Sequence, residues 1–90
     1  MTDQEMRSVL KRLYVKALRT DATPDDLPDT SLVSFLHIDS ISSLEVLILV
    51  EQEFGIEFDD ADLDVRLIDS LDVLIENIRK RAPVGADATP

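Results

Sequence analysis

The chain has 90 residues and no cysteine, and its 19 Asp plus Glu against 9 Lys plus Arg give a formal net charge of −10. This charge argues against nucleic acid and membranes as partners, since both reward positive charge, and it favours basic protein partners. Without cysteine there is no disulfide, thiolate metal site or cysteine nucleophile, and a single histidine excludes a His-rich metal centre. The N-terminus does not look like a signal peptide and no apolar run is long enough to span a bilayer, so we expect a cytoplasmic monomer.

The first predicted element is a helix over residues 2–19. Thr2 and Glu5 fit the capping-box pattern, in which the Thr side chain caps the helix and the Glu side chain reaches back. Apolar residues then recur at spacings of three and four, which predicts one buried stripe: Met6, Val9, Leu10, Leu13, Tyr14, Ala17 and Leu18. With 2 Gly and 4 Pro the chain lacks the turn residues of an all-β fold, so we expect an all-α domain.

Residues 20–39 are predicted to form a long connection. Pro24 and Pro28 interrupt regular structure, and the acids and hydroxyls around them favour turns. A connection this long in a small domain is usually functional or well anchored. We expect its apolar side chains to hold it against the core: Leu27, Leu32, Val33, Phe35 and Leu36.

The second predicted helix runs from Ser40 to Glu53, with Asp39 as its N-cap and Gly55 as its C-cap glycine. On a helical wheel its apolar residues fall into two groups. One is an ordinary core face of Val46, Leu47, Val50 and Phe54. The other is a stripe of Ile41, Leu44 and Ile48, flanked by Glu45, Glu51 and Gln52. Two interpretations are open: neighbouring helices bury both groups, or the stripe is a protein-docking surface.

A short helical turn is predicted within residues 60–66, followed by a last helix. That helix begins near Ser70, with Asp69 or Ser70 as cap, and ends near Lys80 or Arg81, where positive charge suits the helix dipole. Residues 1–81 are therefore expected to form one domain, and residues 82–90 a disordered tail.

Charge is distributed unevenly along the chain. Residues 20–65 contain thirteen acids and no Lys or Arg. The acids of residues 57–64 lack the spacing and the glycine of an EF-hand loop, so they predict a solvated acidic face rather than a calcium site.

Three runs of residues together resemble the acyl carrier protein family, which includes peptidyl and aminoacyl carrier proteins. They are Leu36-His37-Ile38-Asp39-Ser40-Ile41, Leu44-Glu45-Val46-Leu47 and Glu51-Gln52-Glu53-Phe54-Gly55-Ile56-Glu57. The resemblance covers about residues 5–81. It departs from the family at His37, where glycine is usual, and at Ile41, where leucine is commonest. Histidine tolerates a positive φ better than most residues, so we expect that backbone state at His37.

The resemblance implies a four-helix bundle, with three long helices and one short. It also implies that Ser40, presented by Asp39, carries 4′-phosphopantetheine through a phosphodiester, with cargo held as a thioester. The family's partner-contact positions match Ile41, Leu44, Glu45, Ile48 and Gln52. The implied partners are a phosphopantetheinyl transferase, an acyl- or aminoacyl-loading ligase, and downstream synthase or tailoring enzymes.

Two functional hypotheses follow from the sequence. The first is a free-standing, non-catalytic carrier of acyl or aminoacyl intermediates for fatty-acid, polyketide or nonribosomal-peptide-type biosynthesis. The alternative is a small acidic helical adaptor with no prosthetic group. His37 lacks an evident triad, so we interpret it as an exposed loop residue rather than a catalytic one.

Overall fold

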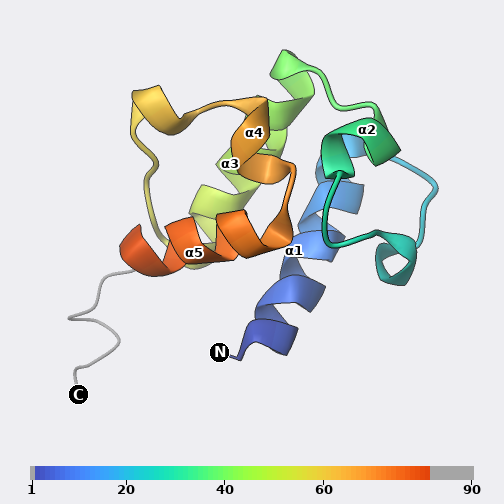
Figure 1. Cartoon of the computed structure of the whole chain (residues 1–90), viewed down its shortest axis with the longest axis horizontal. Helices are drawn as coiled ribbons and strands as arrows, with labels where there is room; N and C mark the ends of the chain where they lie inside the picture. The colour runs from blue at the N-terminus through green and yellow to red at the C-terminus, as the bar shows by residue number, and fades with distance from the viewer. Residues whose placement is uncertain (1, 82–90) are drawn as a thin grey trace.

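Three long helices and two short ones make up the part of the chain that the computed structural model describes, residues 2–81. The helices are α1 (Asp3–Leu18), α2 (Leu32–Leu36), α3 (Ser40–Phe54), α4 (Val65–Ile68) and α5 (Leu71–Arg81), with single 3₁₀ turns at Pro24–Asp26 and Asp60–Asp62. The all-α class is confirmed (Figure 1). The predicted tail of residues 82–90 lies outside the described residues.

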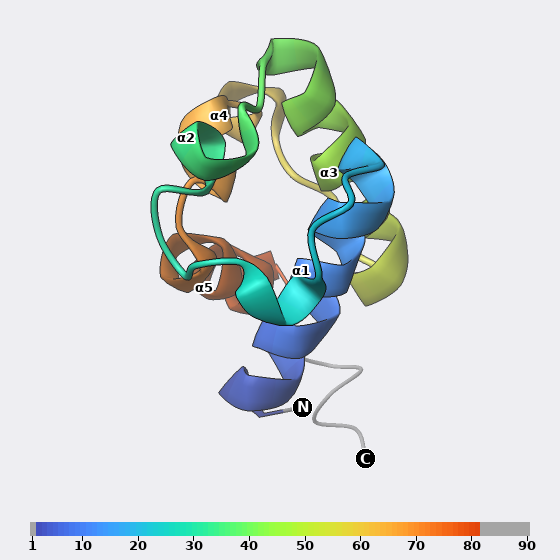
Figure 2. The same ribbon diagram turned by 90° about the vertical axis from the view of Figure 1, so that its right-hand side faces the viewer.

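The helices form two groups around one core. Figure 2 shows α1 and α3 side by side, with α2, α4 and α5 opposite them. Side chains from both groups fill the space between: Tyr14, Leu10, Leu32, Leu47, Ile68, Leu71, Leu74, Ile78, Val46 and Val50 are the largest that are fully buried. The Tyr14 hydroxyl donates a hydrogen bond to the Ile68 carbonyl at 2.5 Å, which links α1 to α4. Burial raises the pKa of Tyr14, so this hydroxyl keeps its proton as a donor.

The ends of the long helices follow the predicted capping chemistry. At α1 the Glu5 N–H donates to Thr2 Oγ1 at 3.1 Å, and the Thr2 N–H donates to Glu5 Oε1 at 2.7 Å, which completes the capping box. Gly55 ends α3 with a φ of 64°, a left-handed state that glycine adopts without a Cβ clash.

The connection of residues 20–39 is more regular than predicted. It contains a 3₁₀ turn and α2, so the bundle has two short helices instead of one. The reason is a tertiary contact: the Leu32 N–H donates to the Asp69 carbonyl at 3.0 Å, and the Val33 N–H donates to Asp69 Oδ1 at 2.9 Å. Asp69 therefore satisfies the first turn of α2, while Ser70 Oγ accepts the Val73 N–H of α5 at 3.5 Å.

One predicted anchor of this connection is wrong. Leu27 and Leu32 are buried as expected, whereas Phe35 is 49% exposed. The α2 helix is only five residues long. It buries Leu32, and the Phe35 side chain remains exposed.

Ion pairs hold the α1 and α5 side of the molecule together. Arg7 of α1 pairs with Asp72 of α5 and with Asp29 of the connection, and Lys11 also reaches Asp29, at 3.2 Å. At the other end of α5, Arg81 pairs with Asp62 and lies 5.3 Å from the centre of the Phe58 ring. These contacts tie both long connections to α5.

Candidate functional site

Ser40 lies at the first position of α3, on the molecular surface. In Figure 1 the start of α3 lies at the end of the molecule opposite the start of α1. Within residues 2–81 no protein hydrogen bond holds the Ser40 hydroxyl; its carbonyl accepts one from Ser43 Oγ, at 2.7 Å. The side chain is therefore free for reaction, while its backbone is fixed by the helix.

The residues before Ser40 turn the chain from α2 into α3. His37 ends α2 with φ 54° and ψ 50°, which confirms the expected left-handed backbone and explains why glycine suits this position. The next residue, Ile38, is buried, and its N–H donates to the Val33 carbonyl at 3.0 Å. His37 itself is exposed, as predicted.

Asp39 caps α3. Its Oδ1 accepts the Ser42 N–H at 2.7 Å, and this hydrogen bond holds the pKa of the carboxyl below its ordinary value. The carboxylate is thus committed to the helix backbone rather than to the Ser40 hydroxyl. An Asp at this position starts the helix and makes Ser40 its first residue.

Three serines lie in the first turn of α3, and their surroundings differ. Ser43 is buried, with 3% of its surface exposed, and its hydroxyl is bonded within the helix. Ser42 is half-buried, whereas Ser40 is exposed. Of these three hydroxyls, that of Ser40 is the most open to an approaching enzyme.

A small depression of about 240 Å³ borders Ser40 and separates α3 from α4. It is lined by Ser40, Ser43, Leu44, Leu63, Asp64 and Val65. Asp64 caps α4 by accepting the Arg66 N–H at 2.9 Å, which holds the pKa of this carboxyl below its ordinary value. The α4 side of the site was not predicted from the sequence, because the only local signal was one capping Asp in an acidic run.

The apolar stripe of α3 is on the surface. Ile41 is 73% exposed, Leu44 43% and Ile48 50%, and Glu45 and Gln52 beside them are also exposed. The opposite face is core: Val46, Leu47 and Val50 are buried, and Phe54 is half-buried. Of the two interpretations of this helix, burial of both groups is therefore wrong.

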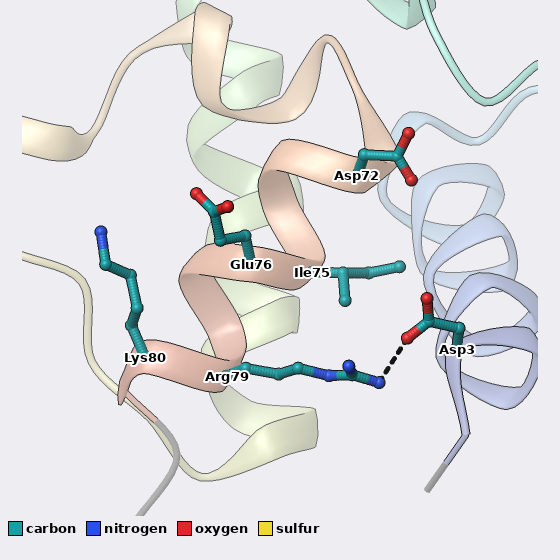
Figure 3. A pocket seen from close by; sticks show the side chains of 6 residues that line it. All are labelled: Asp3, Asp72, Ile75, Glu76, Arg79 and Lys80. Carbon is teal, nitrogen blue, oxygen red and sulfur yellow. Dashed lines mark ion pairs between the residues drawn. The ribbon is translucent and has the colours of Figure 1, made fainter.

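A depression of about 470 Å³ lies elsewhere, between the first turn of α1 and α5 (Figure 3). Its lining side chains are Asp3, Asp72, Ile75, Glu76, Arg79 and Lys80. Figure 3 shows Arg79 reaching from α5 to form an ion pair with Asp3. Its charges are of both signs and partly neutralise one another. It shares no lining residue with the depression next to Ser40.

Residues 2–81 contain no group of three or more His, Cys, Asp or Glu side chains placed to hold a metal ion. Among the helices of this same stretch, none has both the length and the apolar character needed to cross a bilayer.

Comparison with known proteins identifies the family. Residues 8–76 match the family model described as "Phosphopantetheine attachment site". An acyl carrier protein of Desulforapulum autotrophicum is 30% identical over 73 residues, which cover 81% of this chain and 92% of that protein. No solved structure gave a significant match. The match decides between the two hypotheses drawn from the sequence: the chain belongs to the acyl carrier protein family of non-catalytic carriers, which hold their cargo on covalently attached 4′-phosphopantetheine.

Proposed function

We propose that Ser40 is the attachment point of the 4′-phosphopantetheine arm and that residues 1–81 are the carrier domain. The observation that carries this assignment is the exposed Ser40 hydroxyl at the start of α3, inside the matched residues 8–76. Ser42 and Ser43 lie deeper in the same turn. Asp39 supports the assignment, because it fixes the helix start without engaging the Ser40 hydroxyl.

The start of α3 suits a phosphodiester. A helix N-terminus is a favourable place for negative charge, because its first backbone N–H groups point outward and the helix dipole is positive there. Asp39 takes up the Ser42 N–H, and its own negative charge disfavours a second anion close to its carboxylate. Ser40 Oγ would hold the phosphodiester at this exposed helix start, while Asp39 stays bonded to the Ser42 N–H.

The arm supplies a terminal thiol, on which an acyl or aminoacyl group is held as a thioester. We propose that the cargo is an intermediate of fatty-acid, polyketide or nonribosomal-peptide-type biosynthesis. The partners are then a phosphopantetheinyl transferase, an acyl- or aminoacyl-loading ligase, and downstream synthase or tailoring enzymes. Each of them must approach Ser40, since the arm begins there.

The proposed docking surface for these enzymes is the α3 stripe, defined as Ile41, Leu44, Glu45, Ile48 and Gln52. Three large apolar side chains on one face are exposed, and they lie on the same helix as Ser40. Burying them against a partner releases water from apolar surface. The net charge of −10 steers a basic partner toward the molecule.

Intact mass spectrometry tests the attachment site. The chain is incubated with coenzyme A and a broad-specificity phosphopantetheinyl transferase, and we expect the mass increase of one arm. Ser40→Ala should take up none, while the neighbouring Ser42→Ala, the matched control, should take up one. Uptake by Ser40→Ala would show that the assignment is wrong.

A further inference from the structure

The basic side chains of this acidic molecule differ in whether they form ion pairs within the chain. Five of them form ion pairs: Arg7, Lys11, Arg66, Arg79 and Arg81. Four form none with residues 2–81, and three of these four lie on α1 or at its C-cap: Arg12, Lys16 and Arg19. Arg12 and Lys16 are four residues apart and therefore lie on one face of α1, Arg19 follows the end of the helix, and all three are exposed. We call them the α1 basic stripe.

Two members of the α1 basic stripe, Lys16 and Arg19, border a groove against α3. The groove has a volume of about 360 Å³ and is lined by Lys16, Ala17 and Arg19 from α1 and by Glu45, Ile48 and Leu49 from α3. Ala17 and Leu49 are half-buried and pack against the core, while Ile48 is half exposed. The groove therefore has apolar side chains in it and two cations along one side.

Helix-dipole compensation accounts for only part of this arrangement. Basic side chains in the last turn of a helix interact favourably with its dipole, which suits Lys16 and Arg19. Arg12 lies well before the last turn of α1, where the dipole effect has faded. At the end of α5, in contrast, Arg79 and Arg81 are paired with acids of the chain itself. The α1 basic stripe is left available to a partner.

We propose that this groove binds an acidic, amphipathic segment of a partner enzyme. The carboxylates of that segment pair with the α1 basic stripe, and an apolar side chain packs against Ile48 and Leu49. The proposal rests on the proposed function, because the groove shares Glu45 and Ile48 with the α3 stripe. A second copy of the chain is disfavoured as occupant, because two molecules that each carry a net charge of −10 repel each other.

The consequence is a docking surface with two kinds of charge. A partner that is basic overall is steered to the acidic molecule, and a local acidic segment is then required where α1 meets α3. This requirement for a local acidic segment sets the orientation of the partner on α3 and disfavours partners that are basic throughout.

Titration with peptides, followed by two-dimensional NMR of the full chain, tests the proposal. The probe is a short amphipathic peptide with Glu on one face and Leu on the other, and its control is the same peptide with Gln in place of Glu. We expect the Glu peptide to shift the amide signals of Ala17, Ile48 and Leu49 and to bind more weakly as salt is added. The Gln peptide should bind more weakly at every salt concentration.

Matched variants locate the charge that matters. Lys16→Gln and Arg19→Gln should each weaken Glu-peptide binding about two- to fivefold, in keeping with the modest strength of exposed ion pairs. Lys80→Gln removes the same charge from α5 and should leave binding unchanged. No shift with the Glu peptide, equal binding of both peptides, or an equal loss in Lys80→Gln would overturn the proposal. Self-association of the chain through the groove, detected by sedimentation, would also overturn the proposal.

The same samples separate this inference from the proposed function. If the wild-type chain and Lys16→Gln both take up the arm on Ser40 but the Glu peptide does not bind, only the groove proposal fails. If the wild-type chain takes up no arm, the proposed function fails whatever the peptides do.

Discussion

Carboxylates have different bonding partners on the two sides of this molecule. On the side where α1 meets α5, Asp29 and Asp72 are paired with Arg7, which joins three segments far apart in the sequence. Around Ser40 the carboxylates of Asp39 and Asp64 accept hydrogen bonds from backbone N–H groups, and the ion pair of Asp64 with Arg66 is local, two residues along the chain. The first arrangement holds the fold together, and the second leaves the surface next to Ser40 open. The two carboxylates next to Ser40 therefore stabilise their own helices rather than bridge distant segments.

Helix α3 contains the same contrast within one element. Val50 is completely buried, whereas Ile48, two residues away, is 50% exposed. Both are apolar and β-branched, so composition alone does not distinguish them. Their different surroundings make them a matched pair for separating stability from docking.

The largest expected effect comes from that pair. Val50→Ala should lower the free energy of unfolding by about 1–3 kcal/mol, because it removes buried methyl groups and leaves a cavity. Ile48→Ala should change stability little but weaken loading by a partner enzyme. Thermal melts and a loading assay on both variants check this. If Ile48→Ala melts as far below the wild type as Val50→Ala, the α3 stripe belongs to the core.

The second comparison uses two arginines. Arg7 has a side chain that is 21% exposed and bridges distant segments, while Arg66 is 89% exposed and pairs with Asp64, two residues away. Arg7→Gln should lower the free energy of unfolding by about 1 kcal/mol, and Arg66→Gln by close to nothing. Denaturant unfolding of both variants measures the difference. Equal losses would mean that bridging between segments adds nothing here.

Acid should act through the capping carboxylates. The folded pKa values of Glu5, Asp39 and Asp64 are lowered because each carboxylate accepts a backbone N–H. A lowered folded pKa contributes stability that is present above the unfolded value, about 3.9 for Asp, and is lost as pH falls through the folded value. Asp39→Asn keeps a capping oxygen but does not titrate. The stability gap between wild type and this variant should therefore be constant near neutral pH and narrow below about pH 4.

Thermal melts across this pH range check the acid prediction. A gap that stays constant down to the acid limit would show that the Asp39 charge does not contribute to the cap.

The smallest expected effect is that of salt. Of the thirteen acids in residues 20–65, Asp29, Asp59, Asp62 and Asp64 have cationic partners, all from outside that stretch. Repulsion among the others should dominate, so moderate NaCl or millimolar divalent cation should raise the melting temperature by screening it. A flat or falling response from near-zero to physiological ionic strength would mean that the ion pairs outweigh the repulsion.

Local sequence patterns predicted the features that depend on neighbours in the chain. The capping box at Thr2, the Asp39 cap, Gly55 and the two faces of α3 all follow from spacing within one turn or one helix. Tertiary contacts were not predictable in this way. Helix α2 depends on Asp69, which lies 36 residues from Val33, and the pattern assigned Asp69 only to the helix that follows it. The groove between α1 and α3 was missed for the same reason.

Ile38 is an anchor point of the chain just before Ser40. It is buried between two exposed neighbours, and its N–H is bonded to Val33, so the chain is anchored two residues before Ser40. Asp39 accepts the Ser42 N–H, which fixes the chain on the other side of Ser40. On the proposed attachment at Ser40, the base of the arm would therefore be held by a fixed backbone. The length of the arm would then set how far from the docked carrier an active site can lie.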